Sequence, residues 1–97
     1  MFILPCDASP PMPEISRFLG IVIKMFFDDH NPPHFHAQYG DGEALIDMRN
    51  LSVFAGRLPP RVVGLVIEWA TLHQQELVED WQRAQAQQPL QKIPPLE

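Results

Sequence analysis

The stretch HFHAQYGDGEALIDM, residues 34–48, decides the fold of this chain. Polar and apolar residues alternate from His34 to Tyr39, and the alternation resumes from Glu43 to Met48. A period of two is typical of a strand with one face in the core. Asp41-Gly42 lies between the two runs and is typical of a two-residue type I′ turn, whose central positions both need positive φ. The stretch therefore predicts an antiparallel hairpin of strands 34–39 and 43–48.

The predicted turn also sets a register for this hairpin. A two-residue loop at Asp41-Gly42 places Asp47 opposite His36 and Arg49 opposite His34, and all apolar residues of both strands then share one face. A three-residue loop would set the histidines against the apolar residues of the second strand. We therefore expect the two-residue loop.

Two further strands are predicted on either side of the hairpin. Residues 15–27 are rich in β-branched and aromatic side chains, which favours one long central strand with a bend at Gly20. Residues 51–55 are expected to form a short fourth strand. The sequence thus predicts an antiparallel sheet of three to four strands (about 15–27, 34–39, 43–48 and 51–55).

The remainder of the domain is predicted to be helical, from Pro59-Pro60 to about Gln87. Its apolar stripe drifts in the second half, which indicates a kink or two helices near residues 73–75. The predicted fold class is therefore α+β, with the sheet packed by a C-terminal helix or kinked helix pair (about 59–87). The stripe consists of Val62, Val66, Trp69, Ala70, His73, Leu77 and Ala84.

Length and composition predict one domain. The chain has 97 residues, of which 45% are hydrophobic, so it has room for one core and is too apolar for a disordered chain. Four of its 11 prolines fall within the first 13 residues. We expect a flexible arm at 1–13, a single domain at 14–88 and an extended tail at 89–97.

Charge and cysteine content narrow the function classes. The net charge is −5 with only 7 Lys and Arg, so nucleic-acid binding is not expected, whereas an acidic surface suits a basic protein partner. The single cysteine, Cys6, cannot form an intramolecular disulfide. No apolar stretch reaches the roughly 20 residues of a membrane span, and the first residues do not resemble a signal peptide. A cytoplasmic location is expected.

Three histidines, His30, His34 and His36, lie within seven residues. Residues two apart on a strand project to the same side, and neutral imidazoles bind transition metals together with a carboxylate. The sequence therefore predicts a metal site of these three histidines and Asp47, for a divalent ion such as zinc or manganese. Asp28 and Asp29 are further carboxylates nearby.

Two other interpretations of this histidine cluster remain open. The histidines have a structural or partner-facing role in one, and in the other His34 or His36 acts as a general base beside Asp47 without a metal. Trp81 and Arg49 are candidate partner contacts. His73 lies within the helix stripe and is expected to be a core histidine with one hydrogen-bond partner.

The segment DDHNPPHFHA at 28–37, with PEISRFLGIVI at 13–23 and residues 65–81, resembles the small bacterial proteins grouped as domain of unknown function 4160. The resemblance covers about residue 12 to the end. It implies a bacterial or mobile-element protein, often encoded beside a second small protein in toxin–antitoxin-like pairs. The family has no established reaction, so the resemblance implies only that residues 28–36 matter, with Arg17 as a polar neighbour.

Two functions follow as hypotheses. The first is a protein-binding component of a toxin–antitoxin-like pair, whose partner is a second small protein encoded nearby or a second copy. Its contact surfaces would be the helix around Trp81 and the sheet face of His34 and His36. The alternative is a metal-dependent hydrolase or nuclease in which the histidine cluster and Asp47 hold the ion that activates water.

Overall fold

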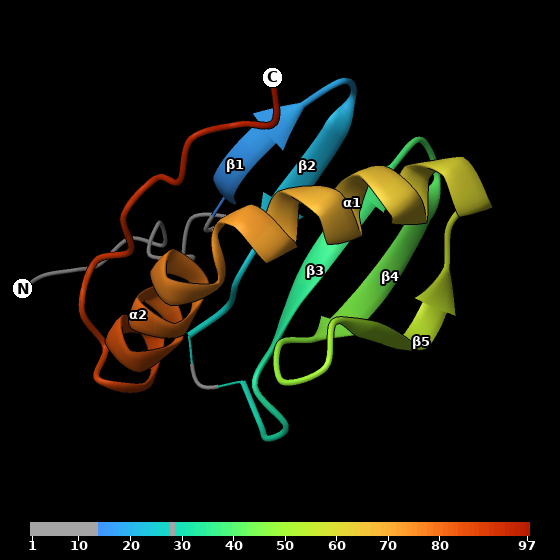
Figure 1. The fold of residues 1–97 in the computed structure, drawn as a ribbon. Coiled ribbons are helices and arrows are strands. Elements are labelled where there is room, and N and C mark those ends of the chain that lie inside the picture. Colours follow the sequence, from blue (N-terminus) through green and yellow to red (C-terminus); the bar gives the residue numbers. More distant parts are fainter. Residues whose placement is uncertain (1–13, 28) are drawn as a thin grey trace, which may run out of the picture.

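The computed structural model describes residues 14–27 and 29–97. The strands form one antiparallel sheet in the order β1-β2-β3-β4-β5, each paired with the next along the chain. Helix α1 crosses one face of this sheet, and α2 lies beside the connection between β2 and β3 (Figure 1). The predicted α+β class is confirmed. The elements are β1 (Glu14–Phe18), β2 (Ile21–Lys24), β3 (His34–Tyr39), β4 (Gly42–Asp47), β5 (Ser52–Arg57), α1 (Pro60–Leu72) and α2 (Gln74–Gln85).

The predicted long strand at 15–27 is wrong, because it is divided into β1 and β2 by a tight turn. Leu19 and Gly20 both have positive φ, at 52° and 80°, and Phe18 pairs with Ile21 across the turn. Leucine rarely adopts this conformation, so the sequence carried only the glycine as a turn signal. The sheet accordingly has five strands.

The β3–β4 hairpin has the predicted two-residue loop, but one position earlier, at Gly40-Asp41. Gly40 has a φ of 59°, as a type II′ turn requires of its first central residue, and Tyr39 pairs with Gly42. The register is therefore shifted by two residues from the predicted one. A shift of two leaves every side chain on its predicted face but changes its neighbours. Asp47 lies opposite His34, and the predicted pairs of Asp47 with His36 and of Arg49 with His34 are wrong.

The core lies between α1 and the apolar face of the sheet. Trp69 on α1 is fully buried, and its ring lies 5.5 Å from that of Phe18 and 5.9 Å from that of Phe35. The other side chains of the predicted stripe are buried as well, except His73, which is half-buried. His73 separates α1 from α2, so the predicted break is confirmed, and its Nδ1 contacts the carboxylate of Glu76.

The C-terminal segment, residues 88–97, contains no helix or strand but packs against the domain. The Ile93 N–H donates to the Ile15 carbonyl at 2.8 Å, so the segment covers the β1 edge of the sheet. The indole Nε1 of Trp69 donates to the Pro94 carbonyl at 2.8 Å. The buried carboxylate of Asp80 accepts from the backbone N–H of Gln91 at 2.9 Å.

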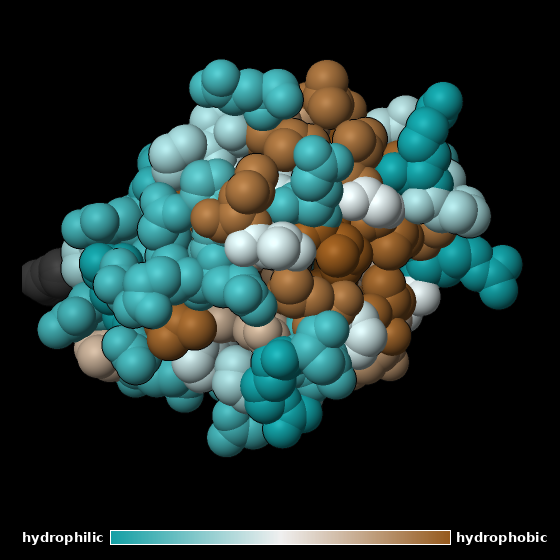
Figure 2. Space-filling model, viewed as in Figure 1, coloured by the Kyte–Doolittle hydropathy of each residue, from teal (hydrophilic) through white to brown (hydrophobic). Residues whose placement is uncertain are grey.

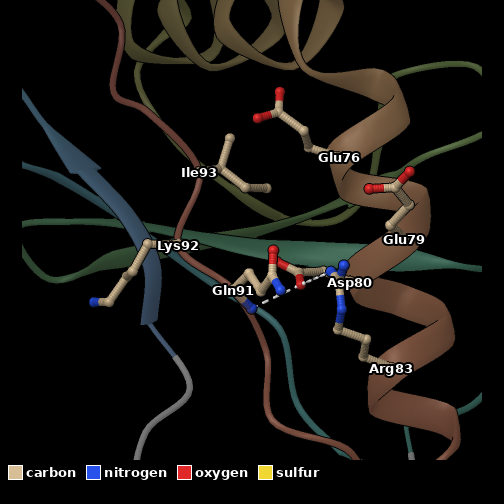
Figure 3. Close-up of a pocket in the computed structure, with 7 residues that line it drawn as sticks. All are labelled: Glu76, Glu79, Asp80, Arg83, Gln91, Lys92 and Ile93. Carbon is tan, nitrogen blue, oxygen red and sulfur yellow. Dashed lines mark hydrogen bonds and ion pairs between the residues drawn. The ribbon is translucent and has the colours of Figure 1, made fainter.

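Figure 3 shows Asp80 between Gln91 and Arg83, beside a polar cavity of about 40 Å³. This volume suits an ordered water rather than a substrate, and the cavity lies between α2 and the C-terminal segment. Neither described helix is long and apolar enough to cross a membrane. The predicted arm at 1–13, with Cys6, lies outside the described residues.

Candidate metal centre

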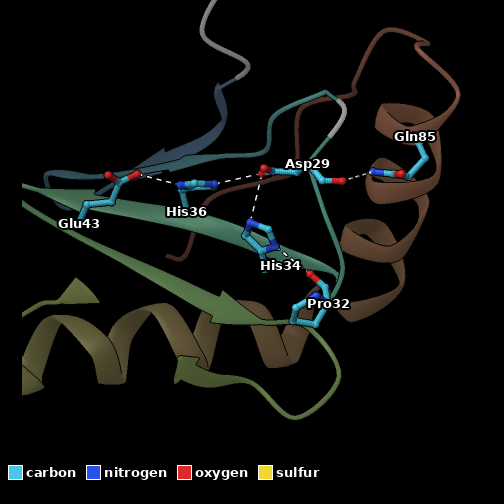
Figure 4. A network of polar contacts seen from close by, with 6 residues as sticks. All are labelled: Asp29, Pro32, His34, His36, Glu43 and Gln85. Atoms are coloured by element: carbon cyan, nitrogen blue, oxygen red, sulfur yellow. Dashed lines mark hydrogen bonds and ion pairs between the residues drawn. The ribbon is translucent and has the colours of Figure 1, made fainter. Parts of the chain in front are cut away.

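Two histidines and one aspartate converge on the polar face of the sheet. His34 and His36 project from the start of β3 on the same side, and Asp29 comes from the connection between β2 and β3 (Figure 4). One oxygen of Asp29, Oδ2, lies 3.1 Å from Nε2 of His34 and 3.2 Å from Nε2 of His36. The ligand atoms of the three residues all lie within 4.8 Å of one another. These three residues are called the Asp29 cluster below.

The other ring nitrogen of each histidine faces an acceptor. Nδ1 of His34 lies 2.8 Å from the Pro32 carbonyl oxygen, and Nδ1 of His36 lies 2.8 Å from Oε2 of Glu43. Carbonyl and carboxylate oxygens only accept hydrogen bonds, so both Nδ1 atoms carry the hydrogen and donate it. In the neutral imidazole the lone pair is then on Nε2. In that neutral form both lone pairs point at Asp29.

This arrangement needs a positive charge at its centre. Two nitrogen lone pairs and a carboxylate oxygen are all acceptors, and their contact at 3.1–3.2 Å is repulsive unless a proton or a metal cation lies between them. With metal–ligand distances of about 2.1 Å, this separation corresponds to an angle of about 95–100° at the ion. That angle lies between the octahedral and tetrahedral values. The separation of Asp29 Oδ2 from each histidine is thus compatible with their binding one ion.

Aromatic rings and α2 hold the Asp29 cluster in place. Phe26 packs edge-on against the His36 ring at 4.5 Å, and Phe54 and Trp81 pack against the His34 ring at 5.4 and 5.6 Å. These contacts leave the side chains of His34 and His36 only 7% and 13% exposed. Such an apolar shell limits access of water and strengthens the interactions of charged groups.

The backbone of Asp29 is fixed as well. Its carbonyl oxygen accepts from Nε2 of Gln85 on α2 at 3.1 Å (Figure 4). Its side chain is 25% exposed, the most open of the three in the Asp29 cluster. Solvent therefore reaches the cluster from the side of the carboxylate.

Two predicted ligands lie outside the Asp29 cluster. His30 is exposed in the connection after β2 and is not part of the group of ligand atoms formed by Asp29, His34 and His36. Asp47 lies on the histidine face, but its two oxygens accept three hydrogen bonds from Arg49, at 2.8 to 3.1 Å. The side-chain hydrogen bonds from Arg49 are the main reason that the pKa of Asp47 is lowered. The same pair raises the pKa of Arg49.

The two predicted partner contacts, Trp81 and Arg49, differ in their exposure to solvent. Trp81 is buried, 8% exposed, with its ring against His34. The Arg49 side chain is 65% exposed while it pairs with Asp47. Arg17 is 63% exposed on β1, which β2 separates from β3, and pairs with Glu14 at 2.8 Å.

Sequence reasoning missed the roles of Asp29 and Glu43. Asp29 was recognised only as a carboxylate near the histidines. Glu43 was hidden by the register, because the true pairing sets Leu45 opposite His36 and makes Glu43 a diagonal neighbour of the His36 ring. The turn signal Gly40-Asp41 would have given that register.

The family described as domain of unknown function (DUF4160) matches residues 20–82. The match includes Asp29, His34, His36 and Glu43 and covers a shorter range than the resemblance implied. No curated protein and no solved structure matches the chain.

Proposed function

The chain belongs to the DUF4160 family, and we propose that it binds one divalent transition metal ion through Asp29, His34 and His36. One observation carries this proposal: two Nε2 atoms, each with its hydrogen fixed on the opposite nitrogen, converge on one carboxylate oxygen. Two protonated imidazoles would also satisfy that oxygen, but like charges would then lie on two rings whose centroids are 5.2 Å apart. A metal satisfies both rings in their neutral form.

The donor set agrees with zinc or manganese. Imidazole nitrogen and carboxylate oxygen suit both ions, and a metal-binding histidine commonly donates its other N–H to a carboxylate or a backbone carbonyl. His36 has the first kind of partner in Glu43, and His34 has the second in Pro32. These two contacts are the supporting hydrogen bonds that the proposed metal site would use.

We further propose metal-dependent hydrolysis as the reaction class that this site would serve. Three protein ligands would leave at least one position at such an ion for water, and a bound metal would lower the pKa of that water. Such water is the nucleophile of hydrolases and nucleases. The open side of Asp29 is where water and a substrate would enter.

Elemental analysis of untagged protein, followed by titration with Zn²⁺ and Mn²⁺ in a calorimeter, tests the metal proposal. We expect one equivalent of ion and loss of binding in His34→Ala, His36→Ala and Asp29→Ala. His30→Ala and Asp47→Asn are the matched controls, since neither residue belongs to the Asp29 cluster, and both should bind as the unaltered chain does. Less than about a tenth of an equivalent, with no gain on adding either ion, would overturn the proposal.

Protein binding within a toxin–antitoxin-like pair is the second function we propose. It is supported by apolar side chains that gather on the surface over α1 and toward β5, while the surface over α2 is mostly hydrophilic (Figure 2). The partner would be a second small protein encoded nearby, and the cytoplasm remains the predicted location. Co-expression with the product of the adjacent gene tests this function. A complex that persists through gel filtration supports it, and two proteins that elute separately contradict it.

A further inference from the structure

We infer that the outer edge of β5 is the docking site for an extended apolar segment of a partner protein, with carboxylate side chains at one end of that segment. The inference rests on the protein-binding function proposed above, and its test needs no metal. β5 is the last strand of the sheet and pairs only with β4 among the described residues. An edge strand of this kind presents N–H and C=O groups on which another strand can pair.

The two edges of the sheet differ. The edge at β1 is covered by the C-terminal segment of the same chain, through the hydrogen bond from Ile93 to Ile15. All six residues of β5 are exposed. Within residues 14–27 and 29–97, the chain therefore covers one edge itself and leaves the other open.

The side chains of β5 favour pairing with a further strand and do not prevent it. Natural edge strands are commonly protected by lysine, proline or inward charges, and residues 52–56 contain none of these. Val53 and Phe54 are 37% and 44% exposed. The protective feature present is a bulge, where the register with β4 shifts between Leu45 and Ile46, and it makes Phe54 the extra residue. A partner strand with apolar side chains would bury both Val53 and Phe54.

Charge decides the chemistry of the partner segment. Arg57 ends β5, and Arg61 follows in the first turn of α1; both are exposed and have no ion-pair partner in the described part of the chain. The first turn of α1 contains no acidic residue and no side-chain cap, although the positive end of the helix dipole favours an anion there. The chain is acidic overall, with a net charge of −5. The surface around Arg57 and Arg61 nevertheless suits the binding of carboxylates.

The same charges argue against a second copy as the occupant. Arg49 precedes β5, and Arg57 follows its apolar part. In parallel self-pairing Arg57 meets Arg57, whereas in antiparallel self-pairing it meets Arg49, whose charge is already paired with Asp47. Each copy also carries the net charge of −5. The arginines at β5 and the net charge of each copy therefore both favour pairing with a different strand that carries acidic residues.

Selection from a phage-displayed library of random 12-residue peptides tests the inference, with the full chain immobilised. We expect enrichment of peptides with alternating β-branched or aromatic residues and Asp or Glu at one end. The best peptide is then synthesised, and its affinity is measured by fluorescence anisotropy. The double variant Arg57→Gln/Arg61→Gln should weaken binding by about threefold to thirtyfold, as expected for two exposed charge pairs. Val53→Lys, which introduces an edge-protecting lysine, should weaken it at least as much.

Val78→Lys is the matched control, because Val78 is also exposed, 40%, but lies on α2. It should leave peptide binding unchanged. The inference is overturned if no acidic apolar peptide is enriched, or if Val53→Lys binds the peptide as tightly as Val78→Lys. It is also overturned if the chain elutes as a dimer that Val53→Lys dissociates, since the occupant would then be a second copy. A native partner that binds the Val53→Lys variant normally would leave the protein-binding function standing and remove only the β5 surface.

Discussion

The hydrogen bond between Glu43 and His36 allows a quantitative prediction of metal affinity. Glu43→Gln keeps an amide oxygen that can accept from Nδ1 of His36 but removes the negative charge of the supporting carboxylate. Loss of such a supporting carboxylate typically lowers metal affinity by 10- to 100-fold. The Glu43 side chain is 41% exposed, so water screens part of its effect. We therefore expect the dissociation constant for Zn²⁺ to rise about tenfold, or about 1.4 kcal/mol.

Competition against a chromophoric zinc chelator at neutral pH measures this change. Glu68→Gln is the matched control, because Glu68 is an exposed glutamate on α1 and should leave the affinity unaltered. Glu43→Ala removes the acceptor as well as the charge, and its effect should exceed that of Glu43→Gln. The reasoning fails if both Glu43 variants bind zinc as Glu68→Gln does while His36→Ala abolishes binding. His36 would then be a ligand whose Nδ1 contact with Glu43 has no effect on the ion.

The remaining predictions concern stability and ionisation. Gly56→Ala should destabilise the fold by at least about 2 kcal/mol in chemical denaturation, because its Cβ would lie 2.2 Å from a backbone oxygen of β4 and its φ is 78°. Gly64→Ala in α1 should stabilise the fold by about 0.5–1 kcal/mol, since a Cβ there meets nothing within 4 Å. Asp80→Ala should destabilise it by about 3 kcal/mol and speed amide exchange in the C-terminal segment, because a buried carboxylate that holds two donors is lost. Arg17→Gln should raise the pKa of Glu14 in an NMR titration, because the hydrogen bond from Arg17 lowers that pKa. The small stability that the pair contributes is present at neutral pH and is lost as the pH falls through the lowered pKa of Glu14. In acid the variant should therefore be as stable as the original chain.

The sequence predicted the elements with strong periodicity and failed where the turn chemistry was ambiguous. The stripe centred on Trp69 and the break near His73 follow from the helical period of apolar residues, which packing against the sheet enforces. The β1–β2 turn was missed because Leu19 adopts a left-handed conformation that local preferences disfavour. Only the pairing of β1 with β2 makes that conformation acceptable. Local sequence does not contain this information.

The candidate site was predicted in part for the same reason. A period of two places His34 and His36 on one face whatever the register, so their proximity could be predicted from the strand alone. The third member of the Asp29 cluster depends on the path of a connection rich in proline, which periodicity does not describe. The choice between Asp47 and Glu43 as neighbours of His36 depended on a register shift of two residues. A single glycine, Gly40, at the first position of the turn determined that register.

Phe54 connects the two proposals, because it belongs to β5 and its ring packs against His34. A strand docked on β5 would cover the exposed part of Phe54 and thereby close one side of the apolar shell around the Asp29 cluster. A better closed shell strengthens the attraction between a cation and its carboxylate. Binding of the partner segment should then favour the metal-bound form, and thermodynamic linkage requires that the metal favour the partner by the same factor. The placement of this one ring would thus make the proposed metal binding and the proposed protein binding parts of one equilibrium.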